Sequence, residues 1–362
     1  MLAVTCFIFV TFFAQNLGML MAGQVLCGLP WGVFATMAPA YASEICPIKL
    51  RGYLANYVCL CWAFGQLMSA GVLNGMESRM DQWAFRIPFA IQWIWPLPLA
   101  AVLWFAPESP YWLARAGKLD QAQKVIKRIT SNSYPLDHDK TLAMVVHTNE
   151  IEDHSGLGSS YRDCFRGTNA RRTEIVCCVW AAQNTTGVAI GGTPTYFFLQ
   201  AGVSSSEAFN FATGALGLAS VGVIISWYLI SRFGRRALYL WPTAALTLLL
   251  LIIGVIDSVS DSAGASYAQA GLVLVWEILF YSTLGPVCYA IIGEMPSLSL
   301  RSKSICLARI AYYISQIFNM AAYPYMVNPT EGNWQGKVGY FYVSMRTRTF
   351  AWPKLGDLML EY

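Results

Sequence analysis

Long stretches of this chain, each of at least 20 residues, contain no charged side chain. They include residues 1–43, 52–76, 87–107, 175–206, 208–231 and 237–256. A helix needs about 20 apolar residues to cross a bilayer, and a spanning segment of this kind satisfies its backbone groups only as a helix. Charged residues make up 12% of the chain, about half the share that is typical of a soluble domain. The sequence therefore predicts an all-α polytopic membrane protein.

Nine membrane spans are expected. Turn-forming residues at 15–18 divide the first stretch, and two further stretches, 267–293 and 305–329, carry few charges. The expected spans are roughly 1–15, 19–43, 53–75, 87–106, 175–199, 209–230, 237–256, 268–292 and 305–327. The positive-inside rule places the more basic set of loops in the cytoplasm. That set comprises 44–52, 107–174, 232–236 and 301–303.

A short motif occurs twice, each time after a long apolar run. Arg51 follows Glu44 by seven residues, Arg301 follows Glu294 by seven residues, and a proline lies between them in both cases. Two membrane halves built on one plan are typical of transporters. The expected domains are a partial N-terminal transmembrane half at 1–106, a cytoplasmic loop with amphipathic helices at 107–174, a partial C-terminal half at 175–330 and an atypical tail at 331–362.

The repeat also indicates how many spans a complete relative would have. Four expected spans precede the central loop and five follow it. When the two motifs are aligned, two spans are missing before residue 1 and one is missing after 305–327, because the tail is too polar and too short to make another. A complete relative would have six plus six spans. We therefore expect a chain truncated at both ends that does not itself transport.

Five motifs, in this order, resemble the sugar porter branch of the major facilitator superfamily, and in particular the fungal α-glucoside (maltose) permeases. They are Ala40–Glu44 with Arg51-Gly52, Pro107–Pro110 with Trp112-Leu113, Arg232–Arg236, Gly285–Tyr289 and Arg301–Lys303. The resemblance covers about residues 1–340. It implies the major facilitator fold, with about nine of its twelve transmembrane helices present. It also implies proton-coupled uptake of maltose or related α-glucosides by alternating access at the plasma membrane.

Charges at the expected cytoplasmic helix ends form the predicted inner gate. They are Glu44, Arg51, Glu108, Arg232, Arg235, Arg236, Glu294 and Arg301. Acidic and basic members on adjacent helices can pair across the inner face. Such pairs must break when that face opens, so they bias the equilibrium between two orientations. The alternative is that these charges only set the topology.

A sugar is neutral, so its site needs amides, hydroxyls and aromatic faces. The fifth expected span supplies two adjacent amides, Gln183 and Asn184, and further along Tyr196. The resemblance implies that the two amides bind sugar hydroxyls, with Asn184 in place of the usual second glutamine. The alternative is a helix–helix hydrogen bond, because amides at this depth need either a cavity or a partner.

Three further residues are candidate substrate contacts. Gly285-Pro286 interrupts the eighth expected span, and the resemblance implies an aromatic sugar contact and gate at Tyr289, which otherwise packs beside a proline kink. Gln66 is a weaker candidate in the third span. Cys59 stands where the family usually has an amide, and it is a poor hydroxyl partner.

Two residues bear on proton coupling. Gln24 lies at a position that the resemblance ties to coupling, where the α-glucoside branch carries an acid, and a glutamine cannot titrate. Glu277 is the remaining acid deep within the chain. It is either a proton site or a buried, hydrogen-bonded acid.

Other classes of protein have no support in the sequence. All three histidines, His138, His147 and His154, lie in one polar loop, and the ten cysteines show no zinc spacing. We expect no metal, no cofactor, no enzymatic activity and no nucleic-acid partner; the partners are an α-glucoside, a proton and the lipid bilayer. A non-transporting sugar sensor and a decayed permease remnant are the alternatives, a monosaccharide hexose is the alternative substrate, and the oligomeric state stays open.

Overall fold

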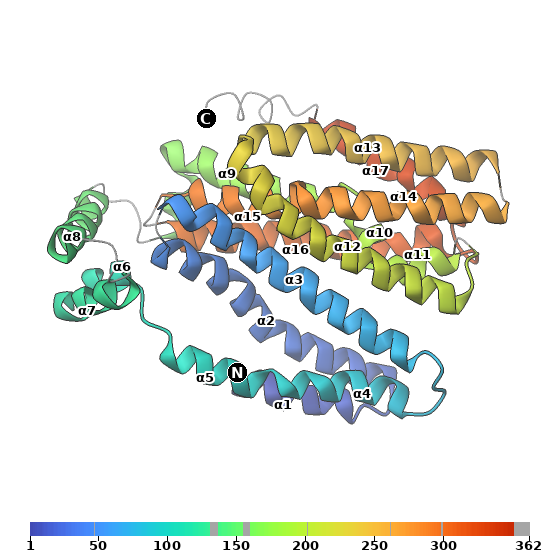
Figure 1. Ribbon diagram of the computed structural model, residues 1–362, viewed down its shortest axis with the longest axis horizontal. Helices are drawn as coiled ribbons and strands as arrows, with labels where there is room; N and C mark the ends of the chain where they lie inside the picture. The colour runs from blue at the N-terminus through green and yellow to red at the C-terminus, as the bar shows by residue number, and fades with distance from the viewer. Residues whose placement is uncertain are drawn as a thin grey trace.

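The computed structural model describes residues 1–46, 48–130, 137–154, 160–200, 202–260, 262–297 and 300–350. Over these residues the chain is helical and contains no strand. Figure 1 shows two groups of long helices side by side, with the short helices α6 (Pro110–Arg115), α7 (Leu119–Ile129) and α8 (His138–His154) projecting beyond one end. The side chain of Arg51 and residues 351–362 of the tail lie outside the described part.

The N-terminal group contains the four expected spans. Helix α1 (Leu2–Phe12) is followed by α2 (Leu17–Ile45), α3 (Ile48–Met76) and a broken segment made of α4 (Trp83–Ile91), η1 (Gln92–Ile94) and α5 (Pro96–Phe105). The predicted break at 15–18 is present because the side chain of Asn16 caps α2, accepting a hydrogen bond from the backbone N–H of Met19 at 2.8 Å. Pro96 begins α5, where its missing N–H removes no helical hydrogen bond.

The C-terminal group contains the five other expected spans, two of which are broken. The first comprises α9 (Gly167–Asn184), α10 (Val188–Gly192) and α11 (Pro194–Gln200). Gly187 separates α9 from α10 with a φ of 89°, a conformation that glycine adopts without strain. The other broken span comprises α14 (Ala263–Ser282) and α15 (Leu284–Glu294), which meet at Thr283, just before the predicted Gly285-Pro286 interruption.

The remaining helices of this group are continuous. They are α12 (Ser205–Arg232), α13 (Arg235–Val259) and α16 (Arg301–Val327). The hydrophobic core lies mainly in the C-terminal group, and it reaches the N-terminal group at Cys59 and Ala63 of α3. Helix α3 packs against α12 and α15, and α2 packs against α15 and α16, so these four helix pairs join the two groups.

Six helical segments of the described chain are long and apolar enough to cross a membrane. They are Leu17–Ile45, Asn56–Met76, Trp83–Phe105, Ser205–Arg232, Arg235–Val259 and Gly264–Glu294. The other three expected spans are also helical but differ from these in length or composition. Helix α1 has 11 residues, α9–α11 is broken, and α16 carries Arg309, Gln316 and Asn319 in its interior.

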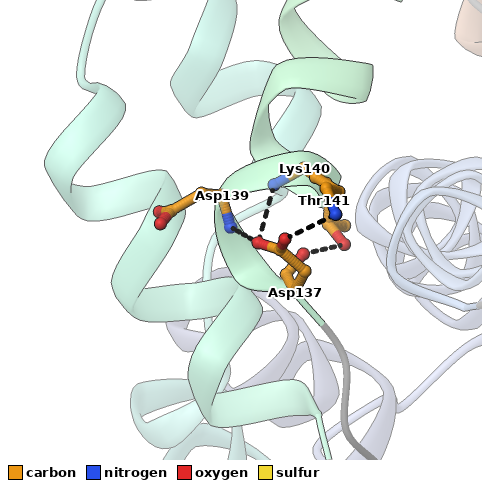
Figure 2. Close-up of polar contacts among 4 residues, drawn as sticks. All are labelled: Asp137, Asp139, Lys140 and Thr141. Atoms are coloured by element: carbon orange, nitrogen blue, oxygen red, sulfur yellow. Dashed lines mark hydrogen bonds and ion pairs between the residues drawn. The ribbon is translucent and has the colours of Figure 1, made fainter.

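In its described residues the central loop contains the three α-helices α6, α7 and α8 and the 3-10 helix η2 (Tyr161–Phe165). Helix α7 lies in the loop for which the sequence predicts amphipathic helices, and it buries Ala122 and Ile126. Asp137 caps α8: its Oδ1 accepts hydrogen bonds from the backbone N–H groups of Asp139 and Lys140, both at 3.2 Å (Figure 2). Asp137 also forms an ion pair with the Lys140 ammonium at 3.1 Å. A carboxylate at a helix N-terminus accepts hydrogen bonds from the free N–H groups, and its negative charge interacts favourably with the helix dipole.

The tail, for which the sequence predicts no span, contains the helix α17 (Val338–Phe350). This helix packs against α13 and α16. Its residues Val338, Tyr342 and Arg346 are buried. The tail is therefore an integral part of the C-terminal group as far as residue 350.

Candidate functional site

The two predicted amides lie at the break between α9 and α10. Gln183 is 6% exposed and Asn184 is 2% exposed. Gln183 donates from Nε2 to the carbonyl oxygen of Gly285 at 3.3 Å. Asn184 donates from Nδ2 to the carbonyl oxygen of Tyr312 at 3.0 Å and to the Ser315 hydroxyl at 2.7 Å. In this conformation both amides therefore join the broken helix to α15 and α16, and their contact with a sugar stays a prediction.

An aromatic cluster lies one turn before the amides. The Trp180 ring meets the Tyr289 ring edge-on, with centroids 5.7 Å apart, and the Tyr312 ring with centroids 6.2 Å apart. Trp180 is fully buried, and Tyr289 is 8% exposed. The structure therefore brings Tyr289 next to the helix that carries Gln183 and Asn184, as expected of residues that share one site.

Arg309 completes this cluster, and it is absent from the site predicted from sequence. Its guanidinium carbon lies 4.2 Å from the centre of the Trp180 ring, a cation–π distance. Its Nη2 donates to the carbonyl oxygen of Ala35 at 3.4 Å, across the two halves, and its Nε has no partner among the described residues. An arginine inside an expected span is by itself a signal of function, because such charges are costly in a membrane.

Gln66 and Tyr196 line a separate cavity of about 370 Å³ between α3, α12 and the segment 192–196. Its polar wall also includes Ser69, Thr193, Thr195 and Thr213. The Gln66 Oε1 accepts a hydrogen bond from the Tyr281 hydroxyl at 3.0 Å, again across the two halves. The structure therefore brings Gln66 and Tyr196 together at this cavity. Cys59 is 4% exposed and lies in the hydrophobic core.

Some of the inner-gate charges make contacts between helices, and the others lie at the surface. Arg235 pairs with Glu294, with Nη2 and Oε1 3.0 Å apart, and both side chains are partly exposed. Arg301 is 3% exposed, and its Nη1 donates to the carbonyl oxygen of Ser43 at 3.5 Å, so it bridges the two halves beside Glu44. The other members that the structure describes lie at the surface, with Glu44 half-buried and Glu108, Arg232 and Arg236 exposed.

The two coupling candidates have opposite environments. Gln24 is exposed on α2. Glu277 of α14 is 0% exposed, and neither of its carboxyl oxygens has a hydrogen-bond partner among the described residues. The alternative of a hydrogen-bonded buried acid thus has no support from the described contacts.

The chain is similar in sequence to known sugar transporters. The family model described as "Sugar (and other) transporter" matches residues 1–352. The maltose permease MAL31 of Saccharomyces cerevisiae is 39% identical over 352 residues, which cover 96% of this chain and 57% of that protein. The general alpha-glucoside permease of the same species is 37% identical over 354 residues, with the same two coverages. The chain therefore spans just over half the length of these relatives.

Solved structures share the fold. The proton:xylose symporter XylE of the major facilitator superfamily, bound to 6-bromo-6-deoxy-D-glucose, superposes with a TM-score of 0.77 at 18% identity, covering 96% of this chain and 77% of that one. The inward-open conformation of XylE from E. coli gives a TM-score of 0.67 at 18% identity, covering 97% and 78%. The expected major facilitator fold, with part of its helices present, is confirmed.

Proposed function

Because the chain belongs to the sugar (and other) transporter family, we propose that its gene product carries α-glucosides such as maltose across the plasma membrane, coupled to protons, by alternating access. The relatives named as maltose and general alpha-glucoside permeases support the substrate class. The central loop lies in the cytoplasm by the positive-inside rule.

The observation that carries the proposal is the pair of amides at a helix break between packed helices. Gln183 and Asn184 donate to Gly285, Tyr312 and Ser315 rather than to their own helix. A sugar hydroxyl can accept the same hydrogen bonds. The exchange then leaves neither side-chain amide without a partner, and so avoids the free-energy cost of an unsatisfied buried donor. The rings of Trp180 and Tyr289 beside the amides provide the apolar faces that sugar sites use.

Alternating access requires contacts that hold one orientation and break in the other. The Arg235–Glu294 ion pair lies within the C-terminal half, and the Arg301–Ser43 hydrogen bond joins the two halves near the same end of the helices. We propose that both hold the inner face closed. Their loss on opening is offset by hydration and by the closure of the outer face.

The test begins with the transcript of the gene. Its longest product and the 362-residue chain are each expressed in a permease-null yeast cell, and uptake of radiolabelled maltose is measured against glucose and xylose. We expect maltose uptake, abolished by a protonophore, from a product with twelve spans, and none from the 362-residue chain. Glucose uptake without maltose uptake would reassign the substrate to a monosaccharide.

Binding measurements separate transport from the alternatives. Maltose is titrated against each purified protein while tryptophan fluorescence is followed, with Trp180→Phe as the control that removes the tryptophan of the proposed site. Saturable binding without uptake by the longest product contradicts transport and supports a sugar sensor. If that product neither binds maltose nor takes it up, the proposal is contradicted, and the decayed remnant is the alternative that remains.

A further inference from the structure

Glu277 is a buried acid near the middle of an apolar helical segment. It lies in the Gly264–Glu294 segment, which is long and apolar enough to span the bilayer. The side chain is 0% exposed, and both Oε1 and Oε2 lack a hydrogen-bond partner among the described residues. A buried carboxylate without a compensating partner is strongly disfavoured, so the neutral acid is the form that this environment accepts.

The carboxyl group lies against the backbone of the broken helix. A Cβ atom built on Gly191 of α10 would overlap Glu277 Oε1 and the Trp276 ring. Glycine at 191 is therefore what allows α10 and α14 to approach so closely. Helix α10 has only five residues, between Gly187 and Thr193, so it can shift relative to α14 without moving a long helix.

No opposite charge lies at the depth of Glu277 in the described helices that pack against α14. These are α10, α12, α13 and α15. The charged residues of these helices lie near helix ends: Glu207, Arg232, Arg235, Arg236, Asp257 and Glu294. The uncharged titratable groups on α14 and these helices are Tyr228, Tyr239, Tyr267, Tyr281, Cys288 and Tyr289. The protonation of Glu277 thus depends on burial rather than on a nearby cation.

A polar connection leads from this region to the cavity. Tyr281 follows Glu277 by one helical turn, and its hydroxyl donates to Gln66 at 3.0 Å. Gln66 lines the cavity of about 370 Å³ together with Gly192 and Thr193, the two residues that follow Gly191. A small displacement of α10 would therefore open a path for water between the cavity and the Glu277 carboxyl.

We infer that Glu277 is a proton-binding site whose occupancy depends on the position of α10. With α10 against α14, the carboxyl holds a proton. When α10 withdraws, water reaches the acid, which releases the proton to that water and becomes a carboxylate; the reverse step rebinds it. This inference rests on the proposed function for its role in transport, where it would provide a titrating group that Gln24 cannot.

The first test reads the protonation state directly and requires no transport. Infrared spectra of the purified 362-residue chain in lipid nanodiscs are recorded at neutral pH, in the carboxylic-acid C=O stretching region. Glu277→Gln should remove a band there. Asp257→Asn is the matched control, because Asp257 is also buried but its Oδ1 accepts a hydrogen bond from Gln269 at 3.1 Å; its spectrum should keep the band. Absence of a Glu277 band at neutral pH overturns the inference.

The second test uses whichever gene product takes up sugar. In that protein, Glu277→Gln should keep sugar exchange across the membrane but lose at least tenfold in sugar-driven proton uptake, while Asp257→Asn keeps both. Proton uptake equal to that of the unsubstituted protein contradicts the coupling role. If no product takes up sugar, the proposed function fails, and the infrared result still decides whether Glu277 binds a proton.

Discussion

Arg346 of helix α17 donates a hydrogen bond from Nη1 to the carbonyl oxygen of Ala182 at 2.8 Å, next to the break that ends α9. The same guanidinium donates from Nη2 to the Thr243 hydroxyl of α13 at 2.7 Å. The same Ala182 carbonyl also accepts hydrogen bonds from the Thr185 backbone N–H at 3.2 Å and from the Thr185 hydroxyl at 2.8 Å. Arg346 therefore adds a charged donor to the last turn of α9 from a residue 164 positions away in sequence. The tail thus stabilises the segment that presents the two amides.

Arg346→Gln should destabilise the protein. A hydrogen bond to a charged group contributes about 1.5–3 kcal/mol, and the shorter glutamine side chain cannot reach both α9 and α13. Arg236→Gln, the same substitution at an exposed position, should change the free energy of unfolding by less than about 0.5 kcal/mol. Denaturant unfolding in detergent measures both. Equal stability of the two variants would show that the contacts of Arg346 contribute little.

The Arg235–Glu294 pair should show a small coupling energy. Both side chains are partly exposed, and exposed pairs contribute about 0.2–1 kcal/mol. A double-mutant cycle of Arg235→Gln and Glu294→Gln, measured by thermal unfolding, should give a value in this range that declines with added salt. The cycle of Arg236→Gln with Glu294→Gln serves as the control and should be additive. A coupling energy above that range, or any coupling in the control, would contradict the interpretation of Arg235–Glu294 as a weak, partly exposed ion pair.

Gly191→Ala should destabilise the protein, whereas Gly192→Ala should be tolerated. A Cβ at 191 would overlap Glu277 and Trp276, while the nearest described side chain to a Cβ at 192 is Met320, at 4.0 Å. Overpacking of this kind costs about 1–3 kcal/mol. Thermal unfolding of both variants tests the contrast, and adding Glu277→Ala to Gly191→Ala should recover part of the loss. No recovery would mean that Glu277 is not the group that excludes a side chain at 191.

The cap of α8 should depend on pH. Hydrogen bonds from the backbone and side chain of Lys140 hold the pKa of the Asp137 carboxyl below its ordinary value of 3.8. Because the folded state favours the ionised form, the cap contributes its full stability above pH 3.8, and this contribution is lost as the pH falls through the lower folded pKa. Amide hydrogen exchange in α8, followed from neutral to acid pH, should show protection declining over that window.

Two substitutions of Asp137 separate charge from capping. Asparagine is also a good N-cap residue, so Asp137→Asn should retain protection and lose its dependence on pH. Asp137→Ala should lower protection at neutral pH, and protection in this variant should not decline further in acid over that window. A pH dependence that persists in the asparagine variant would assign the effect to another group.

Gln183→Ala should weaken sugar binding about tenfold, the effect of losing one hydrogen bond of roughly 1.4 kcal/mol. Gln269→Ala is the matched control, because Gln269 is a buried amide in the same half that bonds to Asp257 at the far end of α13. Isothermal titration of maltose into each purified variant gives the affinities. If both variants bind equally well, the predicted sugar contact of Gln183 is wrong.

Much of the local structure follows from the sequence. The break before α2 was predicted from the turn residues at 15–18, and the interruption of the eighth span from Gly285-Pro286. The resemblance to sugar porters, based on five short motifs, is confirmed by the family match over residues 1–352. These features depend on residues close together in the chain, so the sequence displays them directly.

The partners of the polar side chains do not follow from the sequence. The amides of Gln183 and Asn184 bond to helices more than 100 residues away, and the sequence left sugar contact and helix–helix bonding as alternatives. Arg309 and Arg346 were not predicted, because nothing near them in the chain indicates that one would meet Trp180 and the other Ala182.

The sequence by itself determined that this chain is helical, where its helices break, and the family to which it belongs, because apolar length, turn residues and short motifs are local properties. Only the tertiary structure decided which polar groups are satisfied. Glu277 is one acid among the 20 acidic residues of the sequence. Its burial against Gly191, with no hydrogen-bond partner in the described part of the chain, arises from the packing of two helices more than 80 residues apart. Burial and pairing are properties of such contacts, and they set the free energy of each charge in the membrane.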